Sequence, residues 1–122
     1  MALFALLVGS ATPSLQEAAS GLRLRDASLR FVAALERGRA AALAQGRTWY
    51  VKADGASFTA GPLGEPGIRE VLPGGAVFTA TTSGGEVRFS PNGIAENATF
   101  TLGLATSTRR VVVNQRGKVT CD

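Results

Sequence analysis

The chain has 122 residues, of which 45% are hydrophobic, and this size fits one folded domain with a modest core. It contains no histidine, which removes the commonest general base and the commonest zinc ligand. The net charge of +4 is compatible with an acidic partner, but basic and acidic residues are mixed along the chain, which favours a solvated surface over a dedicated polyanion site.

The chain opens with a short apolar run that contains Leu3, Phe4, Leu6, Leu7 and Val8. It resembles the hydrophobic centre of a signal peptide, but no basic residue precedes it, no Ala-x-Ala-like cleavage site follows, and it is too short to span a bilayer. Two interpretations stay open. The run is either the end of an amphipathic helix that packs on the domain, or the last part of a transmembrane helix whose first part is missing from this chain.

An amphipathic helix is predicted from Ser14 to about Gln45. Pro13 is expected to interrupt a helix or to occupy the first turn of a new one, Ser14 with Glu17 fits a capping box, and Gly46 suits a helix end. At about 100° per residue, one half of the helix carries Leu22, Leu24, Leu29, Phe31, Val32, Leu35 and Leu43, with Arg25, Glu36 and Arg39 intruding on it. We expect Leu22, Leu29, Val32 and Leu35 to pack on the rest of the domain.

Past Gly46 the composition changes to short apolar runs separated by Gly, Pro, Asn and Asp. Strands are predicted at 48–52, 57–59, 68–72, 76–81, 86–89, 98–104, 109–113 and 117–120. Hairpin turns are predicted at Asp54-Gly55, at 83–85 leading into the strand at 86–89, and at 114–116. Since no helix separates consecutive strands, the sheet should be antiparallel. The prediction is an α+β fold, with a helical segment 1–46 packed against a β-domain 47–122.

No group of residues is arranged for catalysis. Without histidine the usual hydrolytic triad cannot form, and Lys52 and Lys118 lie in predicted strands without Ser-x-x-Lys spacing. Asp54, Glu65 and Glu70 fall at turns or strand edges, where they keep the surface soluble, and no cluster has metal-ligand spacing. We therefore expect no enzymatic activity, cofactor, metal or small-molecule substrate. The single cysteine, Cys121, cannot form an internal disulfide and does not define the redox compartment.

The candidate binding feature is the basic end of the chain. Every charged residue between Asn97 and Cys121 is positive, and these residues are Arg109, Arg110, Arg116 and Lys118. A hairpin would bring them near one another and could hold phosphates. No aromatic side chain is interleaved for base stacking, and paired basic residues also protect edge strands from aggregation, so a solvated edge is the alternative.

The order of these features resembles the type IV pilin-like family, and most closely its minor pseudopilins of the GspH/FimT type. The resemblance covers essentially the whole chain and rests on the helix with Pro13, on Val-Arg-Phe-Ser-Pro-Asn-Gly at 87–93, and on Arg-Val-Val-Val-Asn-Gln-Arg-Gly-Lys-Val at 110–119. It implies a bacterial inner-membrane subunit with its β-domain in the periplasm, which assembles through its N-terminal helix with other major and minor pilins or pseudopilins. Residues 1–13 would be the membrane-proximal part, while the family's Phe-Thr-Leu-x-Glu peptidase run is absent.

Two functions follow from this resemblance. The first is a structural subunit of a type II secretion or type IV pilus machine. The second is a DNA-binding minor pilin used in DNA uptake, because some FimT-type members carry a C-terminal Gly-Arg-x-Arg motif. Here the matching residues are Gly-Lys-Val-Thr at 117–120, so the first basic position is kept as Lys118 and the second is Thr120. A third class is an adhesin or signalling β-module whose helix is only a core element.

Overall fold

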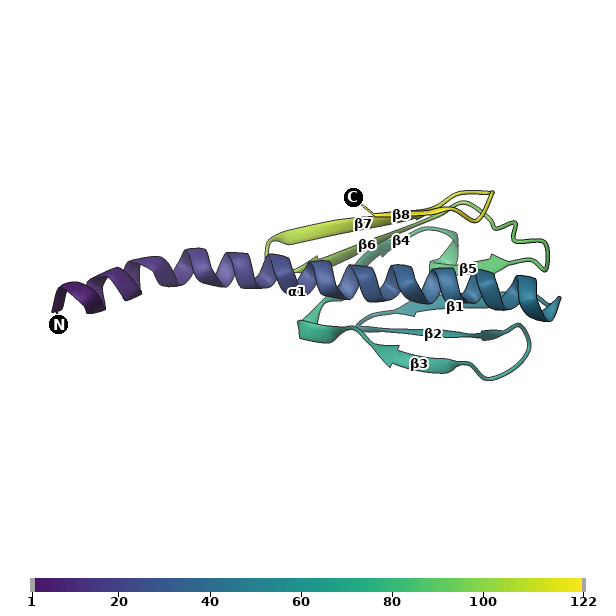
Figure 1. The fold of residues 1–122 in the computed structure, drawn as a ribbon, viewed down its shortest axis with the longest axis horizontal. Helices are drawn as coiled ribbons and strands as arrows, with labels where there is room; N and C mark the ends of the chain where they lie inside the picture. The colour runs from purple at the N-terminus through teal and green to yellow at the C-terminus, as the bar shows by residue number, and fades with distance from the viewer. Residues whose placement is uncertain (1, 122) are drawn as a thin grey trace.

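The computed structural model describes residues 2–121, with side chains for residues 18–82 and 84–121, and shows one long helix lying across two antiparallel sheets (Figure 1). The helix is α1 (Ala2–Gln45), and two short 3₁₀ turns are η1 (Pro73–Gly75) and η2 (Ser83–Gly85). The strands are β1 (Trp49–Asp54), β2 (Ser57–Pro62), β3 (Ile68–Val71), β4 (Val77–Thr81), β5 (Glu86–Phe89), β6 (Ala98–Leu104), β7 (Ser107–Val113) and β8 (Val119–Cys121).

Helix α1 is one continuous element, so the predicted break at Pro13 and the predicted start at Ser14 are wrong. A single proline removes one backbone donor, and the hydrogen bonds of the turns on either side can keep a helix continuous across it. The side chains of Leu3, Phe4, Leu6, Leu7, Val8 and Pro13 lie outside the described residues. The helix ends as predicted, because Gly46 has φ +64° and donates its N–H to the Ala42 carbonyl oxygen at 3.0 Å.

One sheet has the strand order β3-β2-β1-β5. Its centre is the hairpin predicted at Asp54-Gly55, which pairs Asp54 with Ser57 and turns through Gly55 at φ +60°. Strand β5 then pairs with β1, and β3 pairs with β2, so β3 forms one edge of the sheet.

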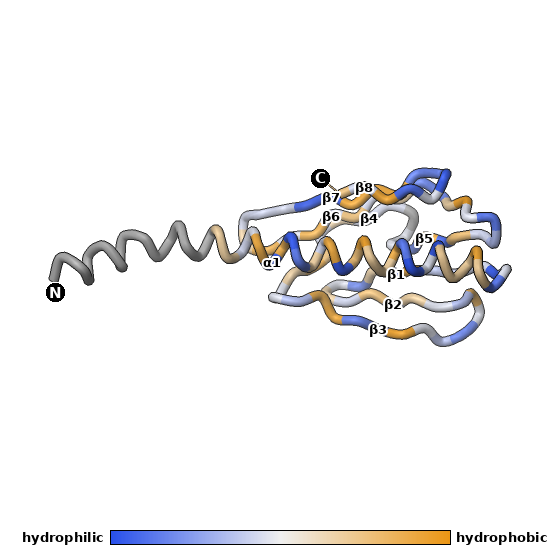
Figure 2. Tube along the Cα trace, viewed as in Figure 1, coloured by the Kyte–Doolittle hydropathy of each residue, from blue (hydrophilic) through white to orange (hydrophobic). Residues whose placement is uncertain are grey.

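The other sheet has the order β4-β6-β7-β8. The predicted last hairpin is present, and the Asn114 side-chain oxygen accepts hydrogen bonds from the backbone N–H groups of Arg116 and Lys118, both at 3.0 Å. Figure 2 shows that the tip of this β7–β8 hairpin is hydrophilic. All strand pairs in the described residues are antiparallel, as predicted.

The hairpin predicted at 83–85 is wrong. Strand β4 pairs with β6 and β5 pairs with β1, so η2 carries the chain from one sheet to the other. Gly84 and Gly85 have φ of +69° and +77° there. Glycines supply this left-handed backbone for a crossing between sheets as readily as for a tight hairpin, so their presence does not distinguish the two.

The core lies where α1 meets both sheets. Phe31 is fully buried on the helix, and its ring packs edge-to-face against Phe58 of one sheet at 5.2 Å and against Phe78 and Phe100 of the other at 4.9 Å each. Small residues let the helix lie close to the sheets, since a Cβ at Gly38 would be 3.4 Å from Val51. The buried side of α1 is lined by Leu24, Ala27, Phe31, Ala34, Leu35 and Ala42.

Candidate functional site

Three surfaces of the described residues could bind a partner, and the first is the outer side of α1. Leu22, Leu29 and Leu43, hereafter the outer leucines, have exposed fractions of 66%, 50% and 47%. Leu22 and Leu29 are seven residues apart and lie on the side of the helix away from Phe31, while the next position of this spacing is Glu36, and Leu43 lies beside Gly93. Singly exposed leucines are ordinary, but a seven-residue repeat is the spacing of a helix–helix seam.

The packing predicted for Leu22 and Leu29 is therefore wrong. Of the other two residues, Leu35 is fully buried and Val32 is half-buried against the core. The reason is that small residues outnumber leucines on the buried side of the helix, where Ala27, Ser28, Ala34, Gly38 and Ala42 lie with two leucines and Phe31. The prediction centred the contact face of the helix on its large apolar residues. The observed contact face is rotated about the helix axis from that position, because a helix that packs closely has small side chains at the contact.

The second surface is a basic groove between α1 and the β7–β8 turn. It has a volume of about 600 Å³ and is lined by Glu36, Arg39, Ala40, Leu43, Arg116, Gly117, Lys118 and Val119. Arg39 Nε donates to the Gly93 carbonyl oxygen at 3.4 Å. The same side chain lies over Gly117, where a Cβ would be 2.7 Å from Arg39 Nε. The helix thus contributes a third cation beside Arg116 and Lys118.

Arg39 was not among the predicted binding residues. Arg39 falls on the apolar half of the predicted helix. A charged side chain at such a position can indicate a polar contact or a binding role, and this signal could have identified it. Its hydrogen-bond partner Gly93 is 54 residues further along the chain, and the sequence offers no means of pairing the two.

The four predicted cations do not form one patch. Arg109 and Arg110 are neighbours on β7, so they point to opposite faces of the sheet, with half-buried Arg109 on the face of buried Val111 and exposed Arg110 on the other. At about 3.3 Å per residue, both lie at least about 10 Å along the strand from the turn that carries Arg116 and Lys118. The expectation that the hairpin gathers all four is wrong, because it joins only the residues at its tip.

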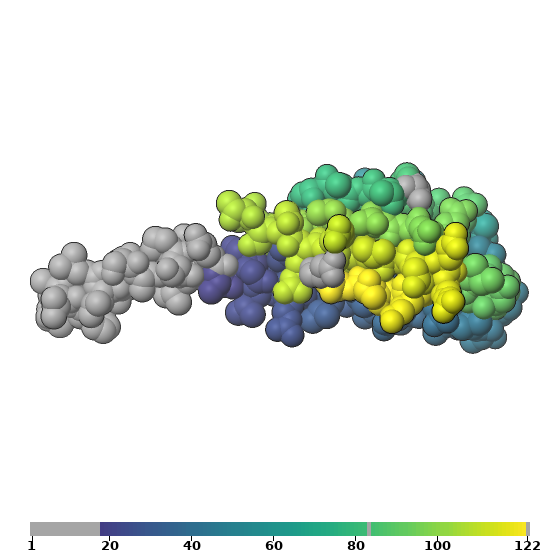
Figure 3. Space-filling view, turned by 90° about the horizontal axis from the view of Figure 1, so that it is seen from above, coloured from purple at the N-terminus to yellow at the C-terminus, as the bar shows by residue number. Residues whose placement is uncertain are grey.

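The outer face of this sheet is seen in Figure 3, with the end of the chain in yellow. Thr120 pairs with Val112, which puts Thr120 on the same face as exposed Arg110. Lys118 is also exposed, two residues before Thr120. A basic residue at position 120 would therefore join Lys118 and Arg110 in one row.

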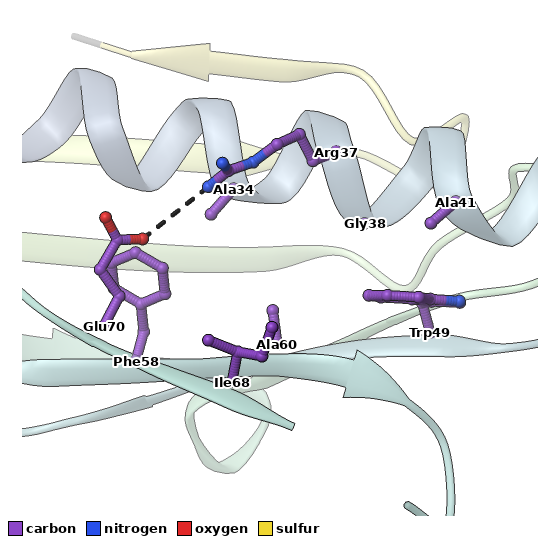
Figure 4. Close-up of a pocket in the computed structure, with 9 residues that line it drawn as sticks. All are labelled: Ala34, Arg37, Gly38, Ala41, Trp49, Phe58, Ala60, Ile68 and Glu70. Atoms are coloured by element: carbon purple, nitrogen blue, oxygen red, sulfur yellow. Dashed lines mark ion pairs between the residues drawn. The ribbon is translucent and has the colours of Figure 1, made fainter. Parts of the chain in front are cut away.

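The third surface is an apolar groove between α1 and the edge of the β3-β2-β1-β5 sheet (Figure 4). Its volume is about 290 Å³. Small residues of the helix line one side of the groove, and the sheet lines the other with Trp49, Phe58, Ala60 and Ile68. An ion pair between Arg37 and Glu70, with 3.8 Å between nitrogen and oxygen, closes one end. The groove thus presents apolar surface with its flanking charges already paired.

The described residues contain neither a group of metal ligands nor a helix that could span a membrane. Across residues 18–82 and 84–121, no three His, Cys, Asp or Glu side chains are grouped so as to hold a metal ion, and the thiol of Cys121 is half-buried. Within the part of the chain that the structure describes, no helix combines the length and apolar character needed to cross a bilayer.

Comparison with known proteins identifies the family. A family model for the type II transport protein GspH matches residues 27–117, well over half of the chain. The chain belongs to the GspH family. The predicted resemblance to minor pseudopilins is confirmed by this match. No curated protein matches the chain.

Solved structures of two pilin-type proteins resemble this GspH-family chain. The type IV minor pilin FimU of Pseudomonas aeruginosa superposes with a TM-score of 0.68 at 19% identity, over 81% of this chain and 87% of FimU. The minor pseudopilin EpsH of the Vibrio cholerae type 2 secretion system gives a TM-score of 0.67 at 13% identity, over 81% of this chain and 95% of EpsH. The predicted α+β fold, a helix packed on antiparallel sheets, is confirmed as the pilin fold.

Proposed function

We propose that the chain is a non-enzymatic minor pseudopilin or minor pilin subunit of a type II secretion or type IV pilus machine. It assembles with other pilin-type subunits through α1, and its β-domain contacts other minor pilins. The GspH family match and the pilin fold support this class of function. By the same reasoning we place the N-terminal run with Leu3 to Val8 in the bacterial inner membrane and the β-domain in the periplasm.

The observation that carries the proposal is the exposure of the outer leucines Leu22 and Leu29. The core of the domain is complete without them, since the helix contacts both sheets through its opposite side. Apolar side chains at seven-residue spacing favour packing along another helix, and Leu22 and Leu29 have this spacing, while the next position is Glu36. A neighbouring subunit's helix on this side would cover Leu22 and Leu29 and leave the sheets exposed.

Disulfide crosslinking in the source organism tests this assembly. In a Cys121→Ser background, Leu29→Cys is combined with single cysteines along the N-terminal helices of the pilin-type proteins encoded by the same organism. We expect a crosslink to at least one of them. The matched control is Ala56→Cys, an exposed position in the β1–β2 turn and outside α1, which should give none. Failure of Leu29→Cys to crosslink with any subunit, or equal crosslinking by both variants, would reject assembly through this face.

A DNA-binding function is a second candidate, and the basic groove is the observation in its favour. Arg39, Arg116 and Lys118 come from distant parts of the chain and line one groove together with a single acidic residue, Glu36. Clustered cations of this kind bind phosphates, and each contact contributes to the salt dependence of binding. Arg110 lies outside this groove, on the outer face of the sheet.

Binding of double-stranded DNA to the full chain at several salt concentrations tests this candidate. Arg116→Ala and Lys118→Ala should each lower the affinity and reduce the salt slope by about 1. Arg30→Ala is the control, because Arg30 is an exposed helix cation paired with Asp26 at 3.3 Å and lies outside the groove. No binding at low salt, or the same loss in all three variants, would exclude the basic groove as a DNA site.

A further inference from the structure

The free edge of β3 has its backbone groups available for pairing. Leu72 donates its N–H to the Ala56 carbonyl oxygen at 2.8 Å, at the position that follows β3. Because backbone groups alternate in direction along a strand, Ile68 and Glu70 also face β2, while Arg69 and Val71 direct their N–H and C=O groups outward. Within residues 2–121 no strand pairs with this outer edge. Two residues of β3 can therefore hydrogen-bond to an added strand.

The side chains of this edge do not protect it. Exposed edge strands usually carry charges that extend past the edge and prevent pairing. Here Arg69 Nε donates to Ser57 Oγ at 3.0 Å, and Glu70 lies 3.8 Å from Arg37, so both charges turn back onto their own domain. Arg69 stays exposed and Glu70 is half-buried, and beside them Ile68 is 82% exposed and Val71 is 63% exposed, so apolar side chains make up much of this edge.

The apolar groove lies directly beside this edge. Ile68 belongs both to β3 and to the sheet side of the groove, where it lies between Phe58 and Trp49 and opposite the helix (Figure 4). A volume of about 290 Å³ is at the lower limit for small-molecule pockets and suits a bulky side chain. Side chains of an added strand alternate between the two faces of the sheet, so those on the helix side would enter the groove.

A second copy of the same strand is a poor occupant. In a two-fold antiparallel pairing of β3 with itself, the two registers with most overlap set either Arg69 opposite Arg69 or Glu70 opposite Glu70. Like charges directly opposite each other destabilise a strand pair. Shifting the register further shortens the ladder and brings Pro66 or Pro73 into it, and proline cannot donate to a ladder. The charges thus favour a different chain.

We propose that the free edge of β3 and the apolar groove together bind an extended segment of a different polypeptide. This segment adds to the four-stranded sheet as an outer strand, hydrogen-bonds to Arg69 and Val71, and places one bulky apolar side chain against Trp49 and Ile68. Its groove-facing residues are uncharged, because Arg37 and Glu70 already neutralise each other at the rim. The surface is separate from the outer leucines, so it does not depend on assembly through α1.

Trp49 is the single tryptophan of the chain, and its fluorescence therefore reports occupation of the groove. The full chain is titrated with a seven-residue capped peptide of alternating threonine and valine with a central phenylalanine. We expect a saturable blue shift of Trp49 emission with a Kd below about 1 mM. A peptide with the same side chains but with N-methylated amides along one edge should give no shift, because it cannot complete the ladder.

Matched variants locate the binding. Ile68→Lys should weaken binding at least tenfold, whereas Ile94→Lys, at a residue 54% exposed and outside both groove and edge, should leave it unchanged. Thermal unfolding checks that both variants fold, and Val71→Lys replaces Ile68→Lys if the latter does not. The proposal is overturned by the absence of a saturable shift, by equal binding of the N-methylated peptide, or by unchanged binding to Ile68→Lys. Sedimentation that shows a dimer for the unmodified chain and a monomer for Ile68→Lys would overturn it in favour of a second copy.

Discussion

Phe31 is predicted to be the residue on which the attachment of α1 to the sheets depends most. It is 0% exposed, and its ring contacts Phe58 from one sheet and Phe78 and Phe100 from the other, with centroid distances of 4.9 to 5.2 Å. Truncating a buried phenylalanine to alanine costs about 3–5 kcal/mol, of which each ring pair accounts for about 0.5–1.5 kcal/mol. We expect Phe31→Ala at the upper end of the first range, because the ring lies between three fixed partners.

The measurement is equilibrium denaturation of the full chain in urea, followed by Trp49 fluorescence and by circular dichroism. The control is Leu29→Ala on the same helix, where the side chain is 50% exposed and the loss should stay below about 1 kcal/mol. Since a small domain is stable by about 5–15 kcal/mol, Phe31→Ala can leave the chain largely unfolded, and Phe31→Leu then supplies a smaller, measurable loss. Equal losses for Phe31→Ala and Leu29→Ala would refute the assignment of the core side of α1.

Three further substitutions test local features. Gly117→Ala should destabilise the chain by about 2 kcal/mol or more, because φ is +81° and the new Cβ would collide with a carbonyl oxygen. Its control is Gly55→Ala, where φ is +60° and the space is open, and this substitution should cost only about 1 kcal/mol in the same urea titration. Asp26→Asn should change stability by less than about 0.5 kcal/mol, since its ion pair with Arg30 is more than half exposed. Thr120→Arg should steepen the salt dependence of DNA binding by about 1, and an unchanged slope would remove the row of cations on the outer face.

Local patterns predicted the strands and turns well. The segment 98–104 was predicted with the bounds that β6 has, because threonines alternate there with buried Phe100 and Leu102. The hairpins at Asp54-Gly55 and at 114–116 were also found, since each turn is defined by residues next to one another. The strands and turns that depend on neighbouring residues could therefore be predicted from the sequence.

The division into two sheets could not be predicted in this way. Strands β4 and β5 are adjacent in the chain but belong to different sheets, and only the contacts of β4 with β6 and of β5 with β1 reveal it. The candidate sites have the same limitation. The basic groove forms because Arg39 contacts Gly93 and Gly117, and the apolar groove forms because Trp49 and Ile68 line the same space. Both depend on contacts between segments that are far apart in the sequence.

The outer leucines follow from the way α1 packs. With Ala27, Ala34 and Gly38 toward the sheets, the helix comes close enough for Phe31 to enter the aromatic cluster, and leucines on that side would hold it further away. Leu22, Leu29 and Leu43 then contribute little to the stability of the domain, because about half or more of each side chain stays in water. Leu43 lies beside Gly93 at the rim of the basic groove, whereas the core of the domain leaves Leu22 and Leu29 exposed. A helix from a neighbouring subunit would cover them, and this is the physical basis on which we propose assembly through α1.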